Sequence, residues 1–217
     1  MKSALLLPFL LLFLASMLPL NDGAFAQSST DSLQIKVHFL YGSKPKKGTN
    51  DSERKEFGGL HGGHVTIEVE TTNFGFGPNK GFHVFGKKNN RHSKWYAYPL
   101  EYWAADTLNA GEKYTTFTIP VSRQQYDSLK KLMVEYALAT PYDYAFIGMR
   151  CASATWDILA QAGILQTHSK SWMILRCFYP KLFRNKLFKQ QKEMRTDIHR
   201  QPGRDSRKWE IDKRKFR

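Results

Sequence analysis

Cys151 has the residue type and the position that most favour chemistry in this chain. It stands where an aromatic loop passes into an apolar helical segment, 151–162, which ends at Gly163. Unpaired backbone N–H groups at the start of a helix favour a negative charge, so a thiol there has a lowered pKa and more nucleophilic thiolate. The adjacent Arg150 could add to this effect. The position therefore predicts a thiol nucleophile.

A thiolate nucleophile needs a positioned imidazole that moves the proton. His64 suits this role because it opens a predicted strand directly behind two glycines, which let another backbone or a substrate approach closely. A third polar group commonly orients the base, and the local choices are His83, Glu68 and Glu70. The two glutamates also fit the solvent-facing side of their strand. The residues themselves therefore leave the third group open.

A structural role for Cys151 competes with the catalytic one. The chain has only two cysteines, and in an oxidising compartment Cys151 and Cys177 could form one disulfide. Such a bond would remove the nucleophile.

Histidine-based zinc binding is a further alternative. His61 and His64 have an H-x-x-H spacing, and His83 or His92 could complete a site. Along a strand, His61 and His64 would face opposite sides, so this alternative requires a loop around the glycines between them.

The elements that must position these residues follow from hydrophobic periodicity. Alternation predicts strands at 34–41, 64–70 and 114–120, and a return strand at 81–86 after a turn-rich segment at 74–78. Ser122 and Gln125 form a capping box that opens a helix ending before Pro141. The second helix is 151–162, and a weaker helical pattern surrounds 182–188. This order of strands followed by helices predicts an α+β domain.

Residues 1–26 have the three regions of a cleavable signal peptide. Lys2 is followed by an apolar run over 4–20 and then by Ala24-Phe25-Ala26, an A-x-A cleavage site. An uncleaved membrane anchor is the alternative, because the apolar run is near the lower length limit for spanning a bilayer. Two prolines in the run and the cleavage site favour the signal peptide. We therefore expect a secreted or periplasmic protein that begins after Ala26.

The remaining chain of about 190 residues is the size of one domain. We divide it into a domain over 27–190 and a basic C-terminal tail over 191–217. The formal net charge is +14, and Lys and Arg recur after Pro180, so an anionic envelope surface is a possible partner of the tail. Export and the lack of a recognition motif argue against nucleic acid. We expect no transmembrane segment in the mature chain.

Two segments together resemble the permuted papain-like cysteine hydrolases, a group that includes YiiX-like, NlpC-type and lecithin:retinol acyltransferase-like proteins. The first is the glycine-flanked His64 that opens a strand ahead of an aromatic-glycine turn. The second is the "Arg-Cys-Ala-Ser-Ala-Thr" sequence that enters a helix ending in Ala-Gly. In this group the histidine precedes the cysteine, as it does here. The resemblance covers roughly residues 35–190.

The resemblance implies a small antiparallel sheet packed against helices, with the nucleophile at a helix N-terminus and no cofactor. It implies Cys151 as nucleophile and His64 as base, and it matches His83 to the second histidine of the acyltransferase-like members. Arg150 departs from the Asn that many relatives carry before the cysteine, so we expect substrate handling to differ.

The function predicted from the sequence is that of an exported thiol hydrolase or acyltransferase. It would act on an amide, ester or thioester of a cell-wall peptide or lipid. A non-catalytic envelope-binding module, which would use the basic tail and an aromatic loop, is the competing hypothesis.

Overall fold

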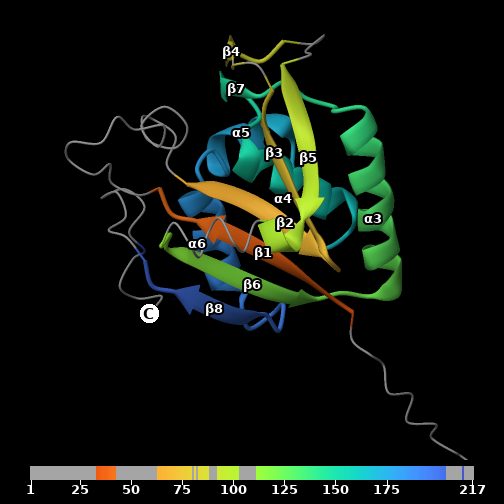
Figure 1. The fold of residues 1–217 in the computed structure, drawn as a ribbon, viewed down its shortest axis with the longest axis vertical. Helices are drawn as coiled ribbons and strands as arrows, with labels where there is room; N and C mark the ends of the chain where they lie inside the picture. The colour runs from red at the N-terminus through yellow and green to blue at the C-terminus, as the bar shows by residue number, and fades with distance from the viewer. Residues whose placement is uncertain are drawn as a thin grey trace, which may run out of the picture. The chain divides into compact units, whose positions relative to one another are not determined.

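A six-stranded antiparallel sheet forms the centre of the molecule (Figure 1). The computed structural model describes residues 33–42, 63–79, 81, 83–87, 92–102, 111–203 and 212. In spatial order the strands are β5 (Ser93–Pro99), β3 (Thr72–Pro78), β2 (His64–Val69), β1 (Gln34–Leu40), β6 (Tyr114–Pro120) and β8 (Asp197–Gln201). With the helices described below, this sheet confirms the predicted α+β class.

The helices cover one face of the sheet in the same order as the strands beneath them. They are α3 (Arg123–Leu138), α4 (Cys151–Gln161), α5 (Lys170–Arg176) and α6 (Pro180–Gln190). α3 packs against β5, α4 against β2 and β3, and α6 against β1. Figure 1 shows α4 and α6 behind the strands, with α3 beside β5. Because α4 has neighbours on several sides, it is buried around almost its whole circumference.

The predicted ends of the two main helices are confirmed. Ser122 accepts a hydrogen bond from the Gln125 backbone N–H, and the Gln125 side chain accepts one from the Ser122 N–H, which is the capping box. α4 begins at Cys151 and ends ahead of Gly163, whose φ of 73° is a left-handed conformation suited to glycine.

Strand register divides the residues of β2 between two faces of the sheet. Ile67 pairs with Val37 on β1 and with Phe74 on β3, and all three side chains are fully buried. We call this apolar side, which carries the helices, the helix face of the sheet. His64, Thr66 and Glu68 alternate with it and therefore point from the opposite side, which we call the polar face.

The return strand was predicted in the wrong place. The chain turns back at once after β2, at residues 70–71, and the segment 72–78 that was read as a turn is β3, which pairs with β2 and β5. Phe74 and Phe76 alternate with glycines in β3, so the strand has a period of two although it resembles a turn in composition.

The predicted strand at 81–86 is instead a short strand of a second sheet. β4 (His83–Phe85) pairs in parallel with β7 (Ala145–Ile147), and these two strands lie beyond the ends of β3 and β5 (Figure 1). This pairing joins residues about 60 positions apart and has no local sequence signal.

The segment assigned to a basic tail contains a strand of the main sheet. β8 pairs with β6, with Ile198 opposite Phe117, and Ile198 packs against the core. The signal peptide predicted at residues 1–26 lies outside the described residues. In the described part of the chain, no helix is long and apolar enough to cross a membrane.

Candidate active site

Cys151 is the first residue of α4 and is 4% exposed. Its thiol accepts a hydrogen bond from the Tyr144 hydroxyl, and the same hydroxyl interacts with the Arg150 guanidinium. Burial raises the pKa of Tyr144, and the bond to Cys151 raises it further, whereas Arg150 lowers it. Tyr144 therefore stays protonated and acts as a hydrogen-bond donor to the sulfur.

Arg150 provides a fixed positive charge beside this cluster. Its side chain is 4% exposed, and its guanidinium carbon lies 4.5 Å from the centre of the Phe178 ring and 5.2 Å from that of Tyr179. The Ser153 hydroxyl accepts a hydrogen bond from the Arg150 N–H at 2.8 Å and thereby caps the start of α4. The helix N-terminus and the guanidinium both favour a thiolate at Cys151.

The two cysteines are both free thiols, so the predicted disulfide alternative is not formed in this structure. Cys177 is fully buried, and burial raises the pKa of its thiol to about 12, although Lys186 opposes this shift. Such a thiol is protonated at neutral pH and unreactive. Cys151 is also buried, but it differs from Cys177 in lying at the first position of α4, beside Arg150.

His83 lies in β4 and is held by a buried carboxylate. Its Nδ1 donates to Asp143 Oδ2 at 2.6 Å, and its side chain is 22% exposed whereas that of Asp143 is 1% exposed. Asp143 also accepts from the Ser93 hydroxyl at 3.2 Å and from the Lys87 backbone N–H at 2.8 Å. Because Nδ1 is engaged, Nε2 is the nitrogen through which His83 can exchange a proton.

One short segment connects the histidine and the cysteine. Asp143 binds His83, and the next residue, Tyr144, binds Cys151. The His83 N–H also donates to the Tyr144 carbonyl at 3.4 Å, and Ser93 Oγ accepts from the Tyr144 N–H at 2.5 Å. Two of the three predicted site residues, His83 and Cys151, are thus hydrogen-bonded to the consecutive residues Asp143 and Tyr144.

His64 is placed on the polar face of the sheet, away from α4. Its Nε2 lies 3.1 Å from the position that a Cβ on Gly75 would occupy, and Gly75 pairs with Thr66 on that face. Burial lowers the pKa of His64 to about 4. Gly63, directly before it, has a φ of 71°, and a Cβ there would lie 2.3 Å from the Leu40 carbonyl oxygen, so only glycine fits. The alternation of β2 therefore places His64 on the face of the sheet opposite to α4.

A buried network on the polar face was missed in the sequence. His38 bonds Glu68 Oε2 and Thr116 Oγ1, each at 2.8 Å, and Lys36 donates to Glu68 Oε1 at 2.6 Å. The prediction that Glu68 faces solvent was wrong, because it is 7% exposed. Burial raises the pKa of Glu68, but the bonds from His38 and Lys36 outweigh it and hold the pKa below its ordinary value.

Glu70 differs from Glu68 and is exposed, as the sequence predicted. It lies in the turn after β2 and accepts hydrogen bonds from Tyr126 and Lys130 of α3, both at 2.9 Å. Neither glutamate contacts His83, whose orienting group is Asp143. Asp143, which the sequence did not suggest, is therefore the candidate for the third polar group of the site.

The zinc alternative stays a prediction, because His61 lies outside the described residues. Among the residues that the structure does describe, no three His, Cys, Asp or Glu side chains are grouped to hold a metal ion. His83 and His92 meet edge to face with their ring centres 5.2 Å apart.

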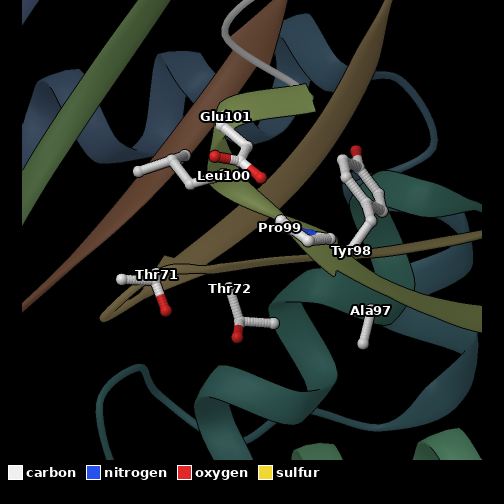
Figure 2. A pocket seen from close by; sticks show the side chains of 7 residues that line it. All are labelled: Thr71, Thr72, Ala97, Tyr98, Pro99, Leu100 and Glu101. Carbon is white, nitrogen blue, oxygen red and sulfur yellow. The ribbon is translucent and has the colours of Figure 1, made fainter.

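The aromatic stretch over 95–103 is divided between core and surface. Trp95 is fully buried and stacks on Phe74, with ring centres 4.6 Å apart. An open groove lies at the C-terminal end of β5, whereas Ser93 is at its N-terminal end. Figure 2 shows the residues that line it, which are Thr71, Thr72, Ala97, Tyr98, Pro99, Leu100 and Glu101. None of the predicted site residues lines this groove.

Comparisons with protein families, curated proteins and solved structures find no match to this chain.

Proposed function

We propose that this protein is a thiol-dependent hydrolase or acyltransferase with Cys151 as the nucleophile and His83, oriented by Asp143, as the proton carrier. The observation that carries the proposal is the segment 143–144, which holds both groups through consecutive residues. A reactive sulfur at a helix N-terminus and a carboxylate-oriented imidazole are the two parts that thiol acyl transfer requires.

The base is assigned to His83 in place of His64 for two reasons. The alternation of β2 points His64 away from α4, and the lowered pKa of its imidazole makes it a weak base at neutral pH. His83 is partly exposed and has the carboxylate partner that fixes the tautomer of a catalytic imidazole. Binding of substrate would have to bring the His83 Nε2 and the Cys151 sulfur into line.

The chemistry follows from these groups. His83 takes the proton of the Cys151 thiol, and the sulfur attacks the carbonyl carbon of an amide, ester or thioester. The oxyanion is stabilised by the backbone N–H groups at the start of α4 and by the charge of Arg150. The carbon–leaving group bond breaks as His83 returns the proton to the leaving group. Water or another acceptor then releases the acyl group from the thioester, with His83 taking the acceptor's proton.

The permuted papain-like fold belongs to this proposal. In support of it, an antiparallel sheet carries helices on one face and the cysteine opens the most buried of them. The exported location is likewise a proposal and rests on the sequence of residues 1–26. In that compartment, cell-wall peptides and lipids are the available carbonyl substrates.

Thiol reactivity and ester hydrolysis together test the proposal. Purified protein is labelled with iodoacetamide, and hydrolysis of a p-nitrophenyl acyl ester is followed, for the wild type, Cys151→Ala and Cys177→Ala. We expect labelling and hydrolysis to be lost in Cys151→Ala. Cys177→Ala serves as the matched control and should retain both, and its folding is checked by circular dichroism. Retained hydrolysis in Cys151→Ala would overturn the proposal.

The choice of base is tested with His83→Gln and His64→Gln. Loss of a positioned general base costs about 100-fold to 10,000-fold in rate, and we expect this loss for His83→Gln alone. The reverse result would return the base to His64.

A further inference from the structure

The ribbon formed by β4 and β7 presents exposed apolar side chains that the proposed chemistry does not use. Val84, Phe85 and Ile147 are 58%, 66% and 50% exposed. Phe85 and Ile147 are direct neighbours in the strand register, and Val84, which alternates with Phe85 in β4, projects from the other side of the two-stranded ribbon. We call these three exposed side chains together the ribbon tip. An exposed cluster of this kind in a soluble domain marks a contact site.

The ribbon tip stands on a closely packed base. Gly86 and Gly148 approach closely, and a Cβ on Gly148 would lie 2.8 Å from the Cβ of Ala145. The Lys87 backbone N–H is bonded to the buried Asp143 at the base of the ribbon. The strands that carry the ribbon tip are therefore anchored to the body of the domain through Asp143.

The sequence on both sides of β4 is strongly basic. Residues 79–94 contain five Lys or Arg and no Asp or Glu. Lys87 follows β4 directly, and Lys94 lies at the start of β5, next to the Ser93 that binds Asp143. Val134 and Leu138 on α3 are also exposed. Their helix carries charges of both signs, so it lacks the uniformly basic surroundings of β4.

We propose that the ribbon tip docks on an anionic phospholipid bilayer, with Phe85, Val84 and Ile147 entering the headgroup layer and Lys87 and Lys94 contacting the lipid phosphates. Apolar side chains that project from a ribbon suit insertion among lipids, whereas a stable protein interface requires a larger complementary surface. Each basic residue close to an anionic surface adds to the attraction. His83 lies in the same ribbon, so docking would hold the candidate site at the lipid surface.

Vesicle flotation tests this inference independently of catalysis. The full-length protein is mixed with phosphatidylcholine vesicles that contain or lack phosphatidylglycerol, at low and at physiological salt. We expect binding to the anionic vesicles, weakened by salt, and equal binding by Cys151→Ala. Phe85→Ser should weaken the affinity about tenfold or more, because a phenyl ring is lost from the lipid contact. The control Leu138→Ser, which removes an even more exposed side chain from α3, should bind like the wild type.

Three outcomes would overturn the inference. The first is that Phe85→Ser binds as tightly as the wild type while its fold is intact by circular dichroism. The second is that binding is lost instead in a variant with Lys213, Arg214 and Lys215 changed to Gln, which would assign the contact to the C-terminal basic residues. The third is that gel filtration shows a dimer that Phe85→Ser dissociates, which would make the patch an interface between two copies. A failure of ester hydrolysis would leave this result unaffected, because the flotation assay does not require Cys151.

Discussion

The two faces of β2 differ in chemistry although both are buried. On the helix face, Val65 and Ile67 are fully buried in the apolar core beneath α4. On the polar face, Thr66 and Glu68 are also buried, and Glu68 belongs to a network of hydrogen-bonded side chains that includes His38 and Thr116. A single strand therefore separates a core that positions a thiol from a polar layer that holds a histidine.

This difference shows that chain order does not establish proximity. The pattern that identifies β2 as a strand, strict alternation, is the same pattern that sends His64 away from Val65 and from the helix that carries Cys151. A histidine at position 65, 67 or 69 of β2 would face α4, whereas His64, like Thr66 and Glu68, faces the polar layer. In the proposed mechanism the base for Cys151 therefore comes from another element, β4, which carries His83.

The largest expected effect is on the helix face. Ile67→Ala removes a fully buried side chain between β1, β3 and α4, and we expect a loss of about 2–5 kcal/mol in the free energy of unfolding. Urea unfolding measures this value, with an unchanged dependence on denaturant as the sign of an intact two-state transition. Lys131→Ala, a substitution at an exposed position on α3, is the control. A loss below 1 kcal/mol would mean that the helix face is not closely packed.

A smaller and pH-dependent effect is expected on the polar face. The pKa of folded His64 is about 4, below its ordinary value near 6.5, so the unfolded chain takes up a proton first as the pH falls. The stability that His64 contributes is complete above pH 6.5 and is lost between pH 6.5 and pH 4. The loss amounts to about 2 kcal/mol between pH 7 and pH 5.

Urea unfolding of the wild type and of His64→Gln at pH 7 and pH 5 measures this component. The variant lacks the titrating ring, so the decrease in stability on acidification should be smaller by about 2 kcal/mol. Glu68 does not interfere, because its lowered pKa confines its own contribution to more acidic conditions. Equal decreases in the two proteins would show that His64 is not buried as described.

Local patterns in the sequence were sufficient for most elements. The alternation of β1, β2 and β6, the capping box of α3 and the start of α4 at Cys151 all depend on residues within one or two turns of chain. β3 was missed because glycine has two uses. In Phe74-Gly75-Phe76-Gly77 the glycines occupy the polar face of a strand, whereas the same residues in isolation favour a turn.

The candidate site was predictable only in part, because its contacts are long-range. Cys151 could be found from its helix, but its partners depend on how β4 meets β7 and on which residue of the loop 142–144 faces inward. Asp143 binds His83 across 60 positions, and His38 reaches Glu68 across 30. Neither pair has a spacing that a helix or a hairpin would impose, so no local signal identifies them.

The smallest expected effect has the opposite sign and comes from the residue next to Ile67. Thr66 is 1% exposed, and its hydroxyl has no hydrogen-bond partner in the part of the chain that the structure describes. Thr66→Val keeps the shape of the side chain and replaces this hydroxyl by a methyl group, so the cost of burying an unpaired polar group disappears. We expect a stability equal to that of the wild type or higher by up to about 1 kcal/mol, measured by urea unfolding. A loss of stability would show that the Thr66 hydroxyl is hydrogen-bonded in solution, and would make it part of the polar layer with His38 and Glu68.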